Sequence, residues 1–231
     1  MSEGWLAIEM SQRSSSVAFA PSAGAPALVR ALEPPTDEID PLVPALDALL
    51  AAAGVTPASI GFVAVSTGPG GFTGLRVAVA TAKALALSLR AQVVAVPSAL
   101  VATRTLARAG QLPDCECGVA LAAKGDSVWL ERVQLHGGMP HRRAAELALP
   151  ETALVRGLAC VLADNHLPDA WKHLLSTAGT PIVAPYWDAA ACLEVGAGLF
   201  RADGATDPFR LEPIYPRKPE AVSLWEGRHG A

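Results

Sequence analysis

Short apolar segments separated by polar or turn-forming residues dominate the first half of the chain. Segments of this length, bounded by Gly, Pro and Ser, are typical of β-strands. We therefore predict three strands in a meander at the start of the chain and two further strands later in the same half. These strands are Trp5–Glu9, Ser15–Ala20, Pro26–Leu32, Ile60–Ser66 and Gln92–Val96.

Between these strands, apolar residues recur at three- and four-residue intervals, which is the period of an α-helix. The predicted helices of this half are Thr36–Ala53, Thr73–Arg90 and Pro97–Ala109. Thr36 or Asp37 is expected to cap the first helix, and Gly54 stands where a C-terminal cap belongs. The order β-β-β-α-β-α-β-α predicts a mixed sheet with helices on its faces.

A second and weaker pass of strands and helices follows the stretch Gly110–Cys117, which we interpret as the seam between two lobes, 1–110 and 111–231. Its predicted strands are Gly118–Ala122, Ser127–Gln134, Leu158–Ala163 and Pro181–Ala184, and its predicted helices are Asp169–Thr177 and Asp188–Arg201. The proline-rich tail from Gly204 is expected to be extended and to lie on the surface.

Composition narrows the class of protein. A hydrophobic fraction of 51% and a charged fraction of 17% in 231 residues exclude a disordered chain and suit one large or two small domains. The net charge of −4 argues against direct binding of RNA phosphates, so any role in RNA chemistry is expected to involve a partner. The acidic start of the chain lacks the basic region of a signal peptide, and no apolar stretch reaches the roughly 20 residues that cross a bilayer. We therefore expect a cytoplasmic protein without membrane contact.

The cysteines and histidines give no metal signature. Cys115 and Cys117 form C-x-C rather than C-x-x-C, and no second pair stands near them. We interpret the four cysteines as free thiols and expect no bound metal.

The glycine-rich turn Gly68-Pro69-Gly70-Gly71-Phe72-Thr73-Gly74 carries the strongest local signal. It joins a buried strand to a helix whose N-terminal N–H groups would suit an anion. The turn is neither G-x-x-x-x-G-K-[ST], since no lysine follows Gly74, nor a G-x-G-x-x-G after a first strand. Spacing alone leaves two interpretations open, a phosphate site or a tight strand-to-helix connection. Phe72 is expected to pack into a neighbouring core.

The identity of the residues in this block goes further than the glycine spacing. G-P-G-G-F-T-G-L-R-V-A-V-A-T-A-K closely resembles the G-P-G-S-F-T-G-[LV]-R-I-G-[VL]-A-x-A-K signature of the TsaB family, also called YeaZ. Gly71 replaces the usual serine, and Val77-Ala78 replaces Ile-Gly. Weaker similarities include Leu6-Ala7-Ile8-Glu9 at the first strand and Pro213-Ile214-Tyr215-Pro216-Arg217 near the end.

The resemblance implies a two-lobed α/β fold of the actin/Hsp70/sugar-kinase (ribonuclease H-like) type, with mixed sheets flanked by helices. Nucleotide-binding members of that superfamily place an acidic residue and small polar residues in the first hairpin. Here Glu9 stands for aspartate, and Met10 replaces a hydroxyl that would face a phosphate. We therefore expect no catalysis by this chain alone. The implied function is that of a non-catalytic subunit that activates TsaD for transfer of threonylcarbamoyl to adenosine 37 of tRNAs that read codons beginning with A.

By the same resemblance, the first two long helices form the partner surface. The helix Thr73–Arg90 is apolar nearly all round, so one face can cover the sheet while the other needs a partner, unless both are covered within one domain. Arg76 and Lys83 could hold an acidic partner or a nucleotide, or be solvated ends of the helix. The predicted interface residues are Thr36, Ile39, Leu42, Val43, Leu46, Thr73, Arg76, Val77, Ala80, Lys83, Ala84 and Leu87.

The partners implied are a TsaD-like catalytic subunit and a TsaE-like ATPase, with a homodimer when the partner is absent and tRNA reached only through the complex. No tightly bound cofactor is expected, although ATP or ADP at the partner interface is compatible with the pattern. The alternative is a stand-alone nucleotide-binding phosphotransferase or hydrolase of the same superfamily, which the glycine turn favours. A third interpretation, a peptidase, finds no Ser-His-Asp spacing or metal pair.

Overall fold

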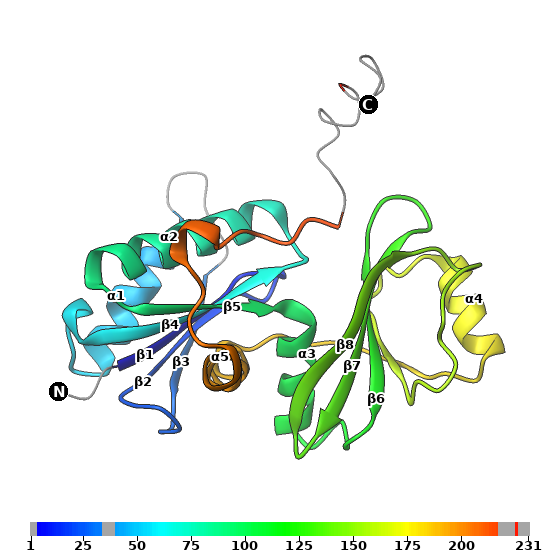
Figure 1. Ribbon diagram of the computed structural model, residues 1–231, viewed down its shortest axis with the longest axis horizontal. Helices are drawn as coiled ribbons and strands as arrows, with labels where there is room; N and C mark the ends of the chain where they lie inside the picture. The colour runs from blue at the N-terminus through cyan, green and yellow to red at the C-terminus, as the bar shows by residue number, and fades with distance from the viewer. Residues whose placement is uncertain (1–3, 34–39, 217–224, 226–231) are drawn as a thin grey trace.

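The structure is a computed structural model that describes residues 4–33, 40–216 and 225. Two five-stranded mixed sheets stand side by side, and helices cover both faces of the first sheet (Figure 1). The strands of the first sheet are β1 (Gly4–Glu9), β2 (Ser16–Ala20), β3 (Leu28–Ala31), β4 (Ile60–Gly68) and β5 (Gln92–Pro97), in the order β3-β2-β1-β4-β5. Each strand predicted for this half is confirmed, with shifts at the ends.

The second sheet repeats this topology. Its strands are β6 (Glu116–Ala122), β7 (Val128–His136), β8 (Met139–Ala148), β9 (Val161–Leu162) and β10 (Ile182–Val183), in the order β10-β9-β6-β7-β8. In both sheets an antiparallel meander of three strands is followed by two parallel strands. The predicted fold class, two lobes of mixed sheets flanked by helices, is therefore confirmed.

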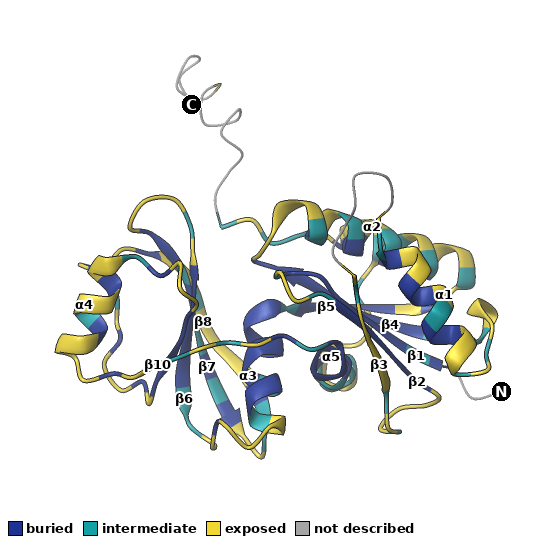
Figure 2. Ribbon diagram, turned by 180° about the vertical axis from the view of Figure 1, so that it is seen from behind, coloured by how far each residue is buried: buried dark blue, intermediate teal, exposed yellow. Residues whose placement is uncertain are grey.

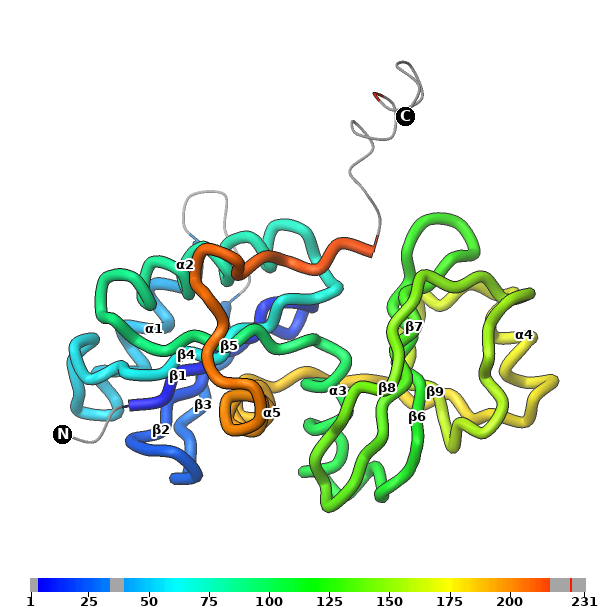
Figure 3. Tube along the Cα trace, in the orientation of Figure 1, coloured from blue at the N-terminus to red at the C-terminus, as the bar shows by residue number. Residues whose placement is uncertain are grey.

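Five α-helices and two short 3-10 helices, η1 (Pro57–Ser59) and η2 (Pro208–Arg210), are assigned in the described part of the chain, and the α-helices complete the layers. They are α1 (Leu42–Ala52), α2 (Phe72–Leu89), α3 (Ser98–Arg108), α4 (Asp169–Thr177) and α5 (Ala189–Asp203). Helices α1 and α2 cover one face of the first sheet, where Leu42, Leu49 and Val79 join a single apolar cluster with residues of β1 and β4. Helices α3 and α5 lie between the two sheets, and α4 covers the outer face of the second (Figures 1 and 3).

The first helix begins later than predicted. The predicted caps Thr36 and Asp37 lie outside the described residues, and the helix begins at Leu42, after Pro41. A helix from Thr36 would hold Pro41 and Pro44 in its interior, where each would remove a backbone hydrogen bond. Starting at Leu42 leaves both prolines in or before the first turn, where no N–H is needed. Gly54, with φ of 68°, follows the helix as predicted.

Helix α5 comes from the second half of the sequence but packs on the first sheet, against β1, β4 and β5. Close approach is possible because small residues face each other: a Cβ added at Gly196 would stand 2.6 Å from the Cβ of Ala64. Inward-facing residues of both sheets, together with α3 and α5, form one continuous apolar cluster. Figure 2 shows this buried interior between the two sheets.

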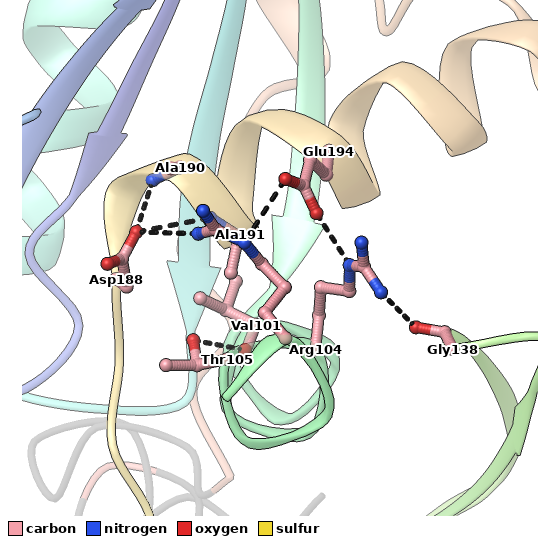
Figure 4. A network of polar contacts seen from close by, with 9 residues as sticks. Val101, Arg104, Thr105, Gly138, Asp188, Ala190, Ala191 and Glu194 are labelled. Carbon is pink, nitrogen blue, oxygen red and sulfur yellow. Dashed lines mark hydrogen bonds and ion pairs between the residues drawn. The ribbon is translucent and has the colours of Figure 1, made fainter. Parts of the chain in front are cut away.

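Polar contacts across this interior fix α3 to its neighbours (Figure 4). Arg104 Nε donates to Glu194 Oε2 at 2.6 Å, and Arg104 Nη1 donates to the carbonyl of Gly138 at 2.6 Å. Glu194 belongs to α5 and Gly138 to the β7–β8 turn. A single side chain on α3 therefore links α5, which packs on the first sheet, to the second sheet. Arg108 adds ion pairs to Glu194 and Asp188.

Candidate functional site: the glycine loop and the exposed face of helix α2

The loop between β4 and α2 is held by hydrogen bonds to the first residue of α3 and to the turn of the first hairpin. Gly68 has φ of 97°, and its bond to Pro69 is cis. The Pro69 carbonyl accepts hydrogen bonds from Ser98 Oγ at 2.7 Å and from Gln12 Nε2 at 3.3 Å. The N–H of Gly71 donates to the Ser11 carbonyl at 2.8 Å. The loop is therefore a rigid connection that fixes where α2 begins.

Two of its glycines are required because the first hairpin lies against them. A Cβ at Gly70 would stand 1.9 Å from the Ser11 carbonyl oxygen, and one at Gly74 would stand 2.5 Å from that of Met10. At Gly71 the nearest such atom is 3.9 Å away, so the serine usual at this position would fit. The Ser11 carbonyl accepts the N–H of Gly71, and the hairpin backbone lies against Gly70 and Gly74. The protein itself therefore takes up part of the hydrogen-bonding capacity that the glycine pattern alone would leave to a phosphate.

Glu9 ends β1 beneath this loop and is fully buried. The N–H and hydroxyl of Ser11 donate to its Oε1 at 2.7 and 2.6 Å. Burial raises the pKa of Glu9 to about 7, against the lowering effect of the Ser11 hydrogen bonds. The hydroxyl of Ser66 also lowers this pKa, yet neither it nor Glu9 Oε2 makes a hydrogen bond of normal geometry with a described residue. The carboxyl group faces the protein interior rather than a solvent-filled site.

Two cavities open between the lobes beside the loop. One has a volume of about 670 Å³ and is lined by residues that include Gln12, Gly70, Asp164 and His166. The other, of about 660 Å³, shares three of these residues and reaches Thr73. Within the described part of the chain, no three His, Cys, Asp or Glu side chains are grouped so that they could hold a metal. The four cysteines are free thiols, as predicted.

Helix α2 presents a long uncovered face to solvent. Its buried residues Leu75, Ala78, Val79, Ala82 and Ala86 face the first sheet. Thr73, Arg76, Ala80, Ala84 and Leu87 are exposed on the opposite side, with Val77 and Lys83 half-buried beside them. These seven are the α2 residues that the sequence predicted for the interface, and the structure brings them together on one stripe, which we call the α2 face.

The apolar character of α2 exceeds what the sheet alone requires. Among the described helices, only α2 is long and apolar enough to cross a membrane by length and composition, with a mean hydropathy of 1.4. Only 28% of its residues are buried, and the covered side packs on β4 and β5. An 18-residue helix is about 27 Å long, so the α2 face offers a substantial contact surface to another protein.

Helix α1 contributes less to this surface than predicted. Leu42 and Leu46 are 0% and 7% exposed and pack in the core, so including them among the partner-facing residues was wrong. Both leucines lie on the face of α1 that packs against the first sheet, together with Ala45, Leu49 and Leu50. Val43, by contrast, is 57% exposed. Thr36 and Ile39 lie outside the described residues.

Phe72 is exposed, so the prediction that it packs into a core was wrong. It is the first residue of α2 and contacts Arg76, one turn further along the same helix, and Tyr215, which comes from the C-terminal tail. The guanidinium carbon of Arg76 lies 3.7 Å from the centre of the Phe72 ring, and the Tyr215 ring is 5.7 Å from the Phe72 ring. In the sequence Tyr215 stands out only as part of a terminal motif, because nothing local indicates a contact across 139 residues.

The comparisons with known proteins agree with this geometry. The family model of TsaD, tRNA N6-adenosine threonylcarbamoyltransferase, matches residues 39–137. YeaZ from Pseudomonas aeruginosa has a TM-score of 0.75 and 23% identity, over 92% of this chain and 99% of that one. A Pseudomonas aeruginosa protein described as similar to peptidase YeaZ has a TM-score of 0.74 and 23% identity, over 93% of this chain and 100% of that one. No curated protein matches the chain significantly in sequence.

These observations define a class: a two-lobed α/β protein whose glycine loop is packed against its own first hairpin and whose second helix has one uncovered face. The chain has the YeaZ fold along almost its whole length, and its residues 39–137 match the TsaD family model. The predicted resemblance to YeaZ is confirmed at the level of the fold.

Proposed function

We propose that this chain is a TsaB-like subunit that binds a TsaD-like catalytic subunit through the α2 face and activates it, without catalysing a reaction itself. The observation that carries the proposal is the stripe formed by the exposed residues Ala80, Ala84 and Leu87 and the half-buried Val77, on a helix already packed on its other side. Small residues allow another helix to approach closely, and a standard interface needs roughly 800 Å² from each partner. The TsaD family match and the YeaZ fold support the identity of the partner.

The reaction proposed for the complex is transfer of threonylcarbamoyl to adenosine 37 of tRNAs that read codons beginning with A. A TsaE-like ATPase completes the assembly, and tRNA is bound through the complex because this chain carries a net charge of −4. ATP or ADP, if used, binds at the subunit interface, and the complex works in the cytoplasm. In the absence of the partner, the α2 face supports a homodimer.

A substitution on the α2 face tests the interface. Ala84→Arg or Ala80→Arg places a long charged side chain in the middle of the stripe and should abolish co-purification with the TsaD-like protein. Both sites are exposed, so the melting temperature should stay within about 2 °C of the wild type. Ala170→Arg, on the exposed side of α4 at the far end of the second lobe, is the matched control and should bind normally.

A reconstituted modification assay tests the activation. The TsaD-like and TsaE-like proteins, ATP, the threonylcarbamoyl donor and tRNA are combined with wild-type chain, with Ala84→Arg or with Ala170→Arg. Modified adenosine should form with the wild type and with Ala170→Arg only. Equal modification without any of these chains would refute the proposed role, and normal binding by Ala80→Arg and Ala84→Arg would place the interface elsewhere.

A second candidate, a stand-alone phosphotransferase or hydrolase, is favoured by one observation, the cavity of about 670 Å³ beside the glycine loop. Against it, Gly70 and Gly71 already contact the Ser11 carbonyl, and Glu9 is buried below the loop. Calorimetry of the isolated chain with ATP and Mg²⁺, followed by a phosphate-release assay, separates the two. Binding with turnover would replace our first proposal by this one.

A further inference from the structure

Arg76 is held in place by two aromatic side chains at the start of the α2 face. Its guanidinium carbon is 3.7 Å from the centre of the Phe72 ring, a distance typical of a cation–π contact. Its Nε donates a hydrogen bond to the Tyr215 hydroxyl at 3.1 Å. The Phe72 and Tyr215 rings are themselves in contact, 5.7 Å apart and inclined by 41°. The three side chains therefore form one unit, although all are at the surface.

The tail that carries Tyr215 is fastened to the first sheet. Thr206 pairs with Val93, and its Oγ1 accepts a hydrogen bond from the N–H of Ala95 at 3.1 Å. Leu211 is 1% exposed and packs in the core under α2, and the N–H of Ile214 donates to the Thr67 carbonyl at 2.7 Å. Tyr215 thus follows directly on an anchored residue, so its hydroxyl is a fixed acceptor for Arg76.

These contacts occupy Nε and one face of the guanidinium group. They leave its two terminal nitrogens available to bind a further acceptor. No carboxylate among the described residues forms an ion pair with Arg76, and the 18 residues of α2 include no Asp or Glu. The terminal nitrogens of arginine donate in parallel and match the two oxygens of one carboxylate. A charge held in this way is ready for an external acceptor, since little side-chain freedom is left to lose on binding.

We propose that Arg76 binds a single carboxylate of the catalytic partner, end-on through its two terminal nitrogens, with Phe72 and Tyr215 as the positioning residues. This inference rests on the proposed function. A carboxylate fits better than an RNA phosphate because the neighbouring positions on the α2 face, Val77 and Ala80, are apolar and small. RNA binding would instead call for a cluster of cations, whereas the α2 face has only Arg76 and, seven positions further along, the half-buried Lys83 within an otherwise apolar stripe. An arginine beside apolar residues is typical of protein–protein interfaces.

The test measures the affinity of the full chain for the TsaD-like protein by calorimetry. Arg76→Gln should weaken binding by about ten- to a hundredfold, because it leaves the partner's carboxylate unpaired. Arg76→Lys keeps the charge but loses the planar fork and should still weaken binding at least about fivefold. Tyr215→Phe should weaken it about threefold, and should have no effect once Arg76 is replaced by glutamine. Arg143→Lys, at an exposed site on β8, is the matched control and should bind normally.

Each other outcome overturns the proposal. If Arg76→Lys binds the TsaD-like protein like the wild type, a point charge is sufficient for binding and the two parallel donors of the guanidinium group have no role. If Arg76→Gln also binds normally while Ala84→Arg does not, the proposed function stands and the carboxylate contact falls. If Arg76 variants keep their protein affinity but the assembled complex loses affinity for tRNA, with a weaker dependence on salt, the guanidinium contacts a phosphate. If the wild type does not bind the TsaD-like protein, both proposals fail.

Discussion

Replacing Gly70 by alanine tests the packing of the glycine loop on the first hairpin. The added Cβ would stand 1.9 Å from the Ser11 carbonyl oxygen, whereas real contacts of this kind are not shorter than 3.0 Å. Loop and hairpin must therefore separate by 3.0 − 1.9 = 1.1 Å. A shift of that size would stretch the Gly71 N to Ser11 O hydrogen bond from 2.8 Å to beyond 3.5 Å, which breaks it.

Two costs add in this variant. Overpacking of a tight contact costs about 1–3 kcal/mol, and the lost hydrogen bond costs about 1 kcal/mol. The sum, about 2–4 kcal/mol, corresponds to a drop in melting temperature of roughly 4–16 °C for a chain of this size. Thermal unfolding followed by circular dichroism measures it.

Gly71 provides the matched control. Its added Cβ would meet nothing closer than 3.9 Å, and Gly71 is the N-cap residue of α2. Gly71→Ser should therefore melt at or slightly above the wild-type temperature, because serine caps a helix better than glycine by a few tenths of a kcal/mol. If Gly70→Ala melts with the wild type, the hairpin does not lie against the loop and the argument against a phosphate site there fails.

Two further predictions concern ionisable side chains, the buried Glu9 and the partly exposed Arg104. The pKa of Glu9 is about 7 in the folded chain against an ordinary value of 4.5, so stability should fall by about 3 kcal/mol as the pH rises from about 4.5 to about 7 and then level off. Melting temperatures across this range should show that slope in the wild type and lose it in Glu9→Gln; an equal slope in both would contradict the assignment. Arg104→Met removes the contacts to Glu194 and Gly138 and should cost about 1–3 kcal/mol in urea unfolding, whereas Arg143→Met should cost almost nothing.

The spacing of apolar residues predicted most of the fold, because most helices and strands bury apolar side chains at regular intervals. The strands of the first sheet and helix α4 are found where alternation or the helical period placed them. Strand β8 was missed because it is a largely exposed edge strand with the polar run His141-Arg142-Arg143, so its pairing with β7 leaves little alternation in the sequence. The start of α1 differs from the prediction because Pro41 and Pro44 limit the helix more strongly than the leucine spacing extends it.

The site was predictable where it lies on one element. The α2 face follows from helical spacing around the packing residues Leu75, Val79 and Ala82. In α1, apolar residues occur on several sides, so spacing could not tell that Leu46 faces the sheet and Val43 the solvent. The contact of Arg76 with Tyr215 could not be predicted, because it depends on how the anchored tail crosses α2 and has no local pattern.

The position of α5 has a consequence for synthesis of the chain. Strand β5 ends at Pro97 and α5 begins at Ala189, so 189 − 97 = 92 positions separate the completed first sheet from the helix that covers β1 and β2. At about 5–20 residues per second, the ribosome needs roughly 5–18 s to cover that distance. During this interval the small apolar side chains Ala7, Ala18 and Ala64 have no α5 to pack against. A chain truncated before Ala189 would keep that surface bare and should depend on chaperones to remain in solution.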